Sequence, residues 1–139
     1  MLVQLALGCA MILVTVASHG LFSAAGVAML TQRVRTYGKP QTHPRAAVML
    51  ALFVLWMFLA TILASVAWAV LYRLLGAITS FEESLYFSLV TMATLGYGDV
   101  VLDKSWRILS AIQGANGSFL FGWSTALTFY AVQRIFEQR

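Results

Sequence analysis

Three long runs of apolar residues, each without a charged side chain, dominate the pattern of this chain. They extend over residues 2–30, 46–72 and 108–133, and arginines bound the second and third runs. A helix that crosses a bilayer needs about 20 mainly apolar residues, so each run predicts one spanning helix. A fourth apolar stretch, 85–101, is shorter and interrupted by glycines, so it predicts a segment that enters the membrane and returns. The pattern therefore predicts an all-α integral membrane protein with three transmembrane helices and one re-entrant segment.

The composition excludes several other classes of protein. Of the 139 residues, 60% are hydrophobic and 10% are charged, and the mean hydropathy is +0.83. An ordinary soluble domain is about a quarter charged, so these charges are too few to cover a soluble surface. The single cysteine, Cys9, excludes a disulfide scaffold. The nine basic residues are scattered or lie in one loop, which argues against a nucleic-acid partner.

The sequence also lacks the residue clusters that catalysis or a resident cofactor would need. His19 and His43 fall on different predicted elements, and no nucleophile and base pair at a useful spacing. We therefore expect neither an enzyme nor a bound cofactor.

Charge asymmetry predicts the orientation of the three helices. The segment between the first two runs carries four basic residues and no acid: Arg33, Arg35, Lys39 and Arg45. The C-terminal end, on the same side, adds Arg134 and Arg139. The other side carries Glu82, Glu83, Asp99 and Asp103 with three basic residues. The positive-inside rule places loop 31–45 and the C-terminus in the cytoplasm and the N-terminus outside. We expect the first run to be a retained helix, because no basic residue precedes it and it is longer than a signal-peptide core.

The loop between the first two runs contains helix breakers. Gly38 and Pro40 are expected to end the first helix, and Pro44 suits the first turn of the second.

The re-entrant segment begins with a short predicted helix. Ser80 and Glu83 have the spacing of a capping box, in which each side chain bonds the other residue's backbone N–H. Apolar residues then continue to Ala93. Directly afterwards comes the hexapeptide Thr94-Leu95-Gly96-Tyr97-Gly98-Asp99. Two glycines at alternate positions allow positive φ, which lets successive carbonyls face one axis. Rings of such carbonyls can replace the hydration shell of a cation.

This hexapeptide resembles the selectivity filter of the potassium-channel pore-domain family, with Leu95 in place of the usual valine or isoleucine. The resemblance covers residues 46–139 and implies an outer helix 46–75, a pore helix 80–93, a filter 94–99 and an inner helix 106–136. Residues 1–30 are then an extra transmembrane helix, and 31–45 are a cytoplasmic loop. Because each chain supplies one filter, the resemblance implies a homotetramer that conducts K+ through a bilayer. A short pore of this kind also favours a plasma membrane, in particular a bacterial inner membrane.

The resemblance assigns roles to individual residues. The filter residues are Thr94, Leu95, Gly96, Tyr97 and Gly98, and the carbonyls of the first four would coordinate K+. Asp99 would lie at the outer mouth. The filter would be supported by Tyr86, Phe87 and Val90, with a hydrogen bond from Tyr86 to Asp99 as a specific hypothesis. Val90 stands where some family members carry a carboxylate. The cavity would be lined by Ser118, Phe121 and Thr125, and the gate or hinge would involve Gly117, Phe129 and Gln133.

Gly117 also has a simpler interpretation, since small residues in membrane helices most often permit close packing. Two alternatives to a potassium channel stay open. Leu95 permits a non-selective cation channel of the same fold. The third interpretation is an accessory membrane subunit that keeps a pore-like loop and does not conduct.

Overall fold

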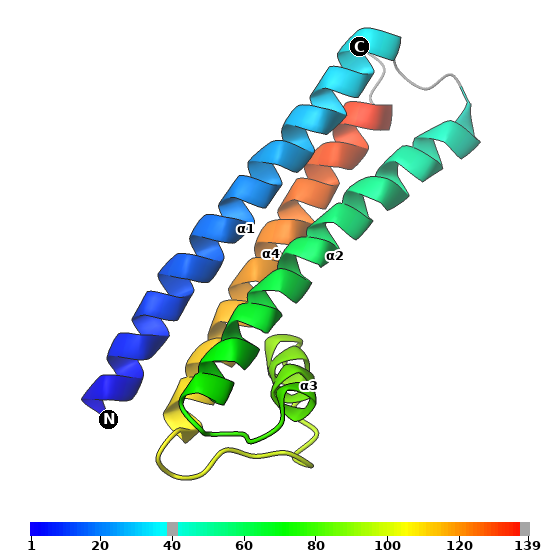
Figure 1. The fold of residues 1–139 in the computed structure, drawn as a ribbon. Helices are drawn as coiled ribbons and strands as arrows, with labels where there is room; N and C mark the ends of the chain where they lie inside the picture. Colours follow the sequence, from blue (N-terminus) through cyan, green and yellow to red (C-terminus); the bar gives the residue numbers. More distant parts are fainter. Residues whose placement is uncertain (39–41, 137–139) are drawn as a thin grey trace.

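The computed structural model describes residues 1–38 and 42–136, which form four helices (Figure 1). They are α1 (Leu2–Tyr37), α2 (His43–Leu74), α3 (Phe81–Met92) and α4 (Arg107–Phe136). The three long helices lie side by side, and the short α3 packs against α2 and α4 at one end of the bundle. No strand occurs within the described ranges.

The first two helices reach further into their connection than predicted. Helix α1 continues to Tyr37, because residues 31–37 contain neither glycine nor proline, and it ends where Gly38 takes a φ of 71°. Helix α2 begins at His43, with Pro44 in its first turn. The predicted loop 31–45 is therefore too long at both ends. Lys39, Pro40 and Arg139 lie outside the described residues.

Helices α3 and α4 begin and end within one residue of the predicted bounds. Ser80 is the N-cap of α3, but its side chain makes no capping hydrogen bond, so the predicted capping box is wrong. Ser80 is exposed, and water can satisfy the free N–H groups there. Glu82 and Glu83 in the first turn stabilise the positive end of the helix dipole instead.

Two of the described helices, α1 and α2, are long and apolar enough to cross a membrane by length and composition. Helix α4 has 30 residues but does not meet the same measure. Its lower hydropathy comes from amides, hydroxyls and glycines within the run, including Gln113, Asn116 and Ser118.

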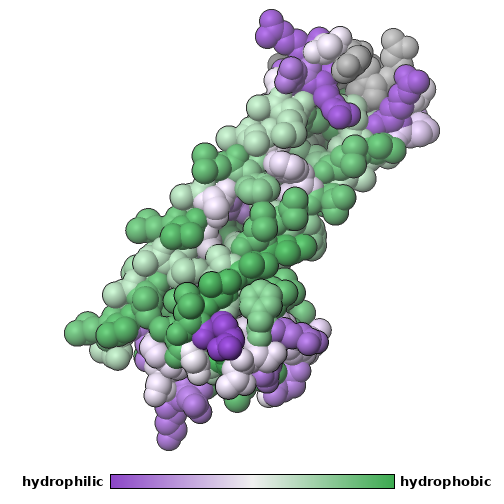
Figure 2. Space-filling view, in the orientation of Figure 1, coloured by the Kyte–Doolittle hydropathy of each residue, from purple (hydrophilic) through white to green (hydrophobic). Residues whose placement is uncertain are grey.

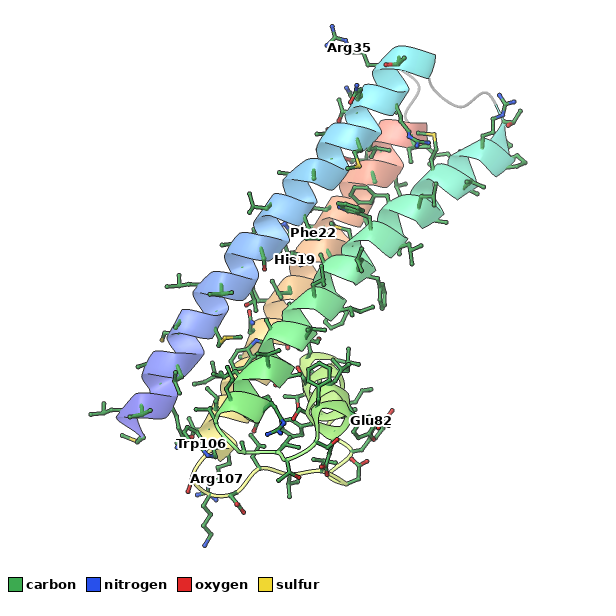
Figure 3. The ribbon with its side chains drawn as sticks, viewed as in Figure 1. His19, Phe22, Arg35, Glu82, Trp106 and Arg107 are labelled. Carbon is green, nitrogen blue, oxygen red and sulfur yellow. The ribbon has the colours of Figure 1, made fainter. Side chains whose placement is uncertain are left out.

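The face of the bundle in Figure 2 is apolar over most of its length, and strongly polar residues gather at its two ends. Figure 3 shows Arg35 at one end, and Glu82, Trp106 and Arg107 at the other. Buried side chains form two clusters. One, around Trp68, Tyr72 and Leu109, lies beside α3, and the other, around Phe53 and Met57, lies toward the α1–α2 connection. An apolar belt between two polar ends is the surface expected of a protein in a bilayer.

Polar side chains join α1 to α4 at three levels. The Ile108 N–H donates to Gln4 Oε1 at 3.1 Å, and Asn116 Nδ2 donates to Thr15 Oγ1 at 2.7 Å. Further along, His19 Nε2 and Ser124 Oγ are 3.0 Å apart. The α1 members of these pairs are buried, so these three polar residues of α1 form one stripe that faces α4.

Candidate functional site

The segment after α3 has an unusual backbone. Thr94, Gly96 and Gly98 have positive φ values of 59°, 55° and 81°, whereas Leu95 and Tyr97 between them do not. The sign of φ thus alternates along five consecutive residues. This alternation turns successive peptide units the same way, so their carbonyls can line one side of the segment. Positive φ was predicted for the two glycines and is confirmed.

Thr94 is the residue whose conformation the sequence did not reveal. It is the one non-glycine residue with positive φ in the described ranges, and a β-branched side chain makes that conformation costly. The end of α3 holds it in place. The Thr94 N–H donates to the Thr91 carbonyl and the Leu95 N–H donates to the Val90 carbonyl, both at 3.0 Å. The alternation begins at Thr94, two residues before Gly96, because the end of α3 fixes the conformation there.

The side chains of this segment are not covered by their own chain. Leu95 is 57% exposed and Tyr97 is 67% exposed. Leu95 borders a hollow of about 250 Å³ that Val90 and Phe121 also line. It therefore lies against the end of α3 and one side of α4, with much of its surface left open.

Tyr86 and Asp99 are joined as hypothesised. The Tyr86 hydroxyl donates to Asp99 Oδ2 at 2.6 Å, which links the second turn of α3 to the end of the 94–99 segment. This hydrogen bond lowers the pKa of the Asp99 carboxyl below its ordinary value. A charged carboxylate is thereby kept at the exposed edge of the segment.

Helix α3 is also held from behind, by a buried network centred on Gln113. Gln113 Nε2 donates to Ser88 Oγ at 2.6 Å, and Gln113 Oε1 accepts from the Tyr72 hydroxyl at 2.8 Å. Ser88 in turn donates to the Ser65 carbonyl at 2.6 Å. The network joins α2, α3 and α4. Gln113 was not among the site residues predicted from the sequence, because its partners lie 25 and 41 residues away in the chain.

The other two predicted support residues lie near this network. Phe87 is buried, and its ring meets that of Tyr72 edge to face, with centroids 5.3 Å apart. Val90 is half-buried and lines the hollow beside Leu95. Its apolar side chain offers no second carboxylate to pair with Asp99.

Gly117 marks a very close approach of α4 to α3. A Cβ placed on Gly117 would lie 2.8 Å from the carbonyl carbon of Met92, and still closer to the oxygen. Gly117 is itself buried. The packing interpretation of this glycine is therefore confirmed, whereas its use as a hinge stays a prediction.

The remaining predicted residues of α4 share a face that the chain leaves largely uncovered. Ser118, Thr125, Phe129 and Gln133 are exposed, and Phe121 is half-buried. Ser118 and Thr125 direct their hydroxyls to the carbonyls of Gly114 and Phe121 in their own helix. By contrast, Asn116 and Leu120 on another face are buried. One face of α4 thus packs within the chain, and the face with the predicted cavity residues is available to other molecules.

Comparison with known families places this site in context. A family described as "Ion channel" matches residues 51–134, which is more than half of the chain and includes α3, the 94–99 segment and nearly all of α4. Comparison with curated proteins and with solved structures returned no match. From the extent of the family match, the chain belongs to the ion channel family.

Proposed function

We propose that this protein is a potassium-selective channel, in which four copies of the chain surround one axis. The observation that carries the proposal is the alternating backbone of residues 94–98, directly after a 12-residue helix. Four such segments would present rings of carbonyls from Thr94, Leu95, Gly96 and Tyr97 to a dehydrated K+ ion. Gly98 completes the alternation, and four copies of Asp99 would concentrate cations at the outer mouth.

The proposed topology has three spanning helices and a re-entrant α3. Helix α4 crosses the membrane in this proposal although its hydropathy is lower, because its polar face lines water. Its 30 residues give a length of about 45 Å, which exceeds a hydrocarbon core of roughly 30 Å. The α1–α2 connection and the C-terminus face the cytoplasm of a cell with this protein in its plasma membrane, and the N-terminus faces outside.

The proposed conduction path continues below the filter. Ser118, Phe121 and Thr125 line a hydrated cavity, and the C-terminal ends of the four α3 helices favour a cation there. Phe129 and Gln133 form the cytoplasmic constriction, and Gly117 is the point about which α4 bends. The exposure of Ser118, Thr125, Phe129 and Gln133 in the single chain supports this arrangement.

Flux from liposomes that contain the purified protein tests the proposal. We expect K+ efflux that barium blocks and that greatly exceeds Na+ efflux. Gly96→Ala should abolish it, because positive φ at this position is costly for alanine. The matched control is Gly20→Ala on α1, where an added Cβ would make an ordinary contact, 3.7 Å from the Trp123 ring.

The alternatives give different results in the same assay. Equal Na+ and K+ flux would contradict selectivity and indicate a non-selective channel. Leu95 would then be the first residue to substitute. The absence of flux from intact, folded protein would indicate an accessory subunit. Chemical crosslinking that saturates at a mass other than four chains would contradict the tetramer.

A further inference from the structure

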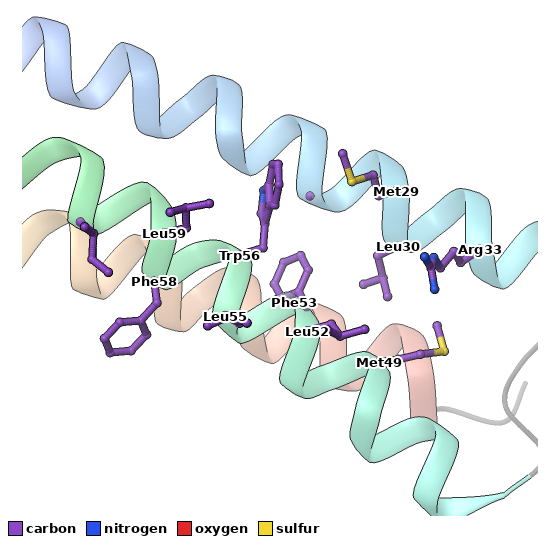
Figure 4. Close-up of a pocket in the computed structure, with 12 residues that line it drawn as sticks. Met29, Leu30, Arg33, Met49, Leu52, Phe53, Leu55, Trp56, Phe58 and Leu59 are labelled. Atoms are coloured by element: carbon purple, nitrogen blue, oxygen red, sulfur yellow. The ribbon is translucent and has the colours of Figure 1, made fainter.

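A long apolar groove runs between α1 and α2, apart from the 94–99 segment (Figure 4). Its volume is about 600 Å³, within the usual range of sites for small molecules. Helix α1 contributes Gly26, Met29 and Leu30, and α2 contributes a row of large apolar side chains. In Figure 4 the groove faces the viewer and α4 passes behind α2. The groove therefore opens on the side away from the helix that would line the pore.

The indole of Trp56 forms the floor of the groove. Gly26 lets the indole of Trp56 approach so closely that a Cβ would lie 2.7 Å from Trp56 Cδ1. The Trp56 Nε1–H donates to the Phe22 carbonyl at 2.8 Å, and the two rings pack with centroids 5.1 Å apart. Trp56 is thus fixed across the two helices. Leu52 and Leu55 on α2 line the groove and leave half or more of their surface open, at 52% and 65% exposure.

One charged residue borders this apolar surface. Arg33 lines the groove at the end near the α1–α2 connection, and its guanidinium lies between α1 and Met49. The acids of the described residues are Glu82 and Glu83 on α3 and Asp99 and Asp103 between α3 and α4, and these segments lie at the opposite end of the molecule (Figure 1). Within the described ranges, Arg33 forms no ion pair with any of them. A guanidinium in this position suits a phosphate group, which it can bind through two parallel hydrogen bonds.

These features together select one class of occupant. An acyl chain fits a groove that is open, apolar and parallel to the helices, and a phosphate fits the arginine at its end. A second copy of this chain fits the groove less well. In a parallel assembly its described carboxylates would lie at the end of the bundle away from Arg33 and could not pair with it. Free phosphate would leave the apolar surface unused.

We propose that the α1–α2 groove is a binding site for an anionic phospholipid, with an acyl chain along Leu52 and Trp56 and the phosphate at Arg33. The site uses the cytoplasmic leaflet, so it rests on the proposed orientation of the chain and not on conduction. The extra helix α1 supplies the arginine and one wall. This gives α1 a function that the pore alone does not require.

Lipid retention by the purified full-length protein tests the site without measuring ion flux. Native mass spectrometry would count the lipids that stay bound when palmitoyl-oleoyl phosphatidylglycerol or the phosphatidylcholine with the same acyl chains is added in detergent. We expect preferential retention of phosphatidylglycerol, at one lipid per chain. Arg33→Gln should weaken it about fivefold, the effect of one basic residue at an anionic surface. Leu52→Trp, which fills the groove, should prevent retention of both lipids.

The matched control is Arg35→Gln, which removes the same charge from an exposed position two residues along α1. It should retain phosphatidylglycerol as the parent protein does. Equal retention of the two lipids, or an equal loss in Arg33→Gln and Arg35→Gln, would overturn the site. Efficient crosslinking between chains through Leu55→Cys would overturn it in favour of a second copy of the chain. Because K+ flux is measured separately, a failure here is distinguishable from a failure of the proposed channel function.

Discussion

Gly117 on α4 lies directly against the backbone of Met92, the last residue of α3, and leaves no room for a side chain. The next turn of backbone after Met92 carries Thr94, where the alternating conformation begins. The inner helix is therefore in contact with the base of the candidate filter. A shift of α4 at this point must displace the end of α3 or lose the contact.

Gly117→Ala is expected to destabilise the protein by about 1–3 kcal/mol, because the added methyl forces the two backbones apart. Thermal unfolding of the purified protein would measure the loss, and K+ flux should fall with it. Gly122→Ala is the control, because its Cβ would meet open space. Equal effects of the two substitutions would show that helix flexibility at glycine, and not contact with Met92, is what matters.

Gln113→Met should destabilise the protein by about 1–3 kcal/mol, since it leaves the buried Tyr72 hydroxyl without its acceptor and removes the donor to Ser88. The measurement is the midpoint of thermal unfolding. Gln32→Met makes the same change at an exposed site on α1 and should have little effect. If Gln113→Met unfolds at the temperature of the Gln32 variant, the network does not hold α3 in place.

Tyr86→Phe should raise the pKa of Asp99, because the hydrogen bond from the hydroxyl is the main cause of its lowered value. For a lowered pKa, the stabilisation from this bond is present above the ordinary carboxyl range, near pH 4, and is lost as the pH falls through the Asp99 pKa. The external pH at which K+ current is half-blocked should therefore be higher in the variant. Tyr130→Phe on α4 is the control. An unchanged midpoint in Tyr86→Phe would mean that Asp99 does not control entry of cations.

The contact between Thr15 and Asn116 is expected to couple α1 to α4 by about 0.6 kcal/mol, the average for such bonds in membrane proteins. A double-mutant cycle of Thr15→Val and Asn116→Leu, read by unfolding free energy in detergent, would measure the coupling. Thr15→Val combined with Thr125→Val should be additive, because Thr125 lies on the uncovered face. A coupling no larger than in this second pair would mean that α1 packs against α4 without stabilisation from the Thr15–Asn116 hydrogen bond.

Much of this fold could be predicted from the linear pattern. The bounds of α3 agree with local signals, Ser80 at its start and the glycines beyond Ala93, whereas the predicted bounds of α4 came with the family resemblance. The positive φ of the two filter glycines and the Tyr86–Asp99 hydrogen bond could also be predicted, because the residues concerned are close in sequence and the motif is specific. The capping box failed because an exposed helix end can use water and nearby acids in place of its own side chain.

The sequence by itself determined that the chain has apolar helices for a membrane, that its charges lie at two ends, and that one hexapeptide carries the candidate chemistry. These properties depend on composition and on spacings of a few residues. Only the tertiary structure decided that Thr94 joins the glycines in left-handed backbone, that Gln113 ties three helices together, and that Gly26 and Arg33 shape a groove with α2. The Gln113 network and the groove depend on partners far away in the chain, and the close packing that brings them together leaves no periodic trace in the sequence. Thr94 depends instead on two backbone hydrogen bonds at the end of α3, which no pattern of residue types announces.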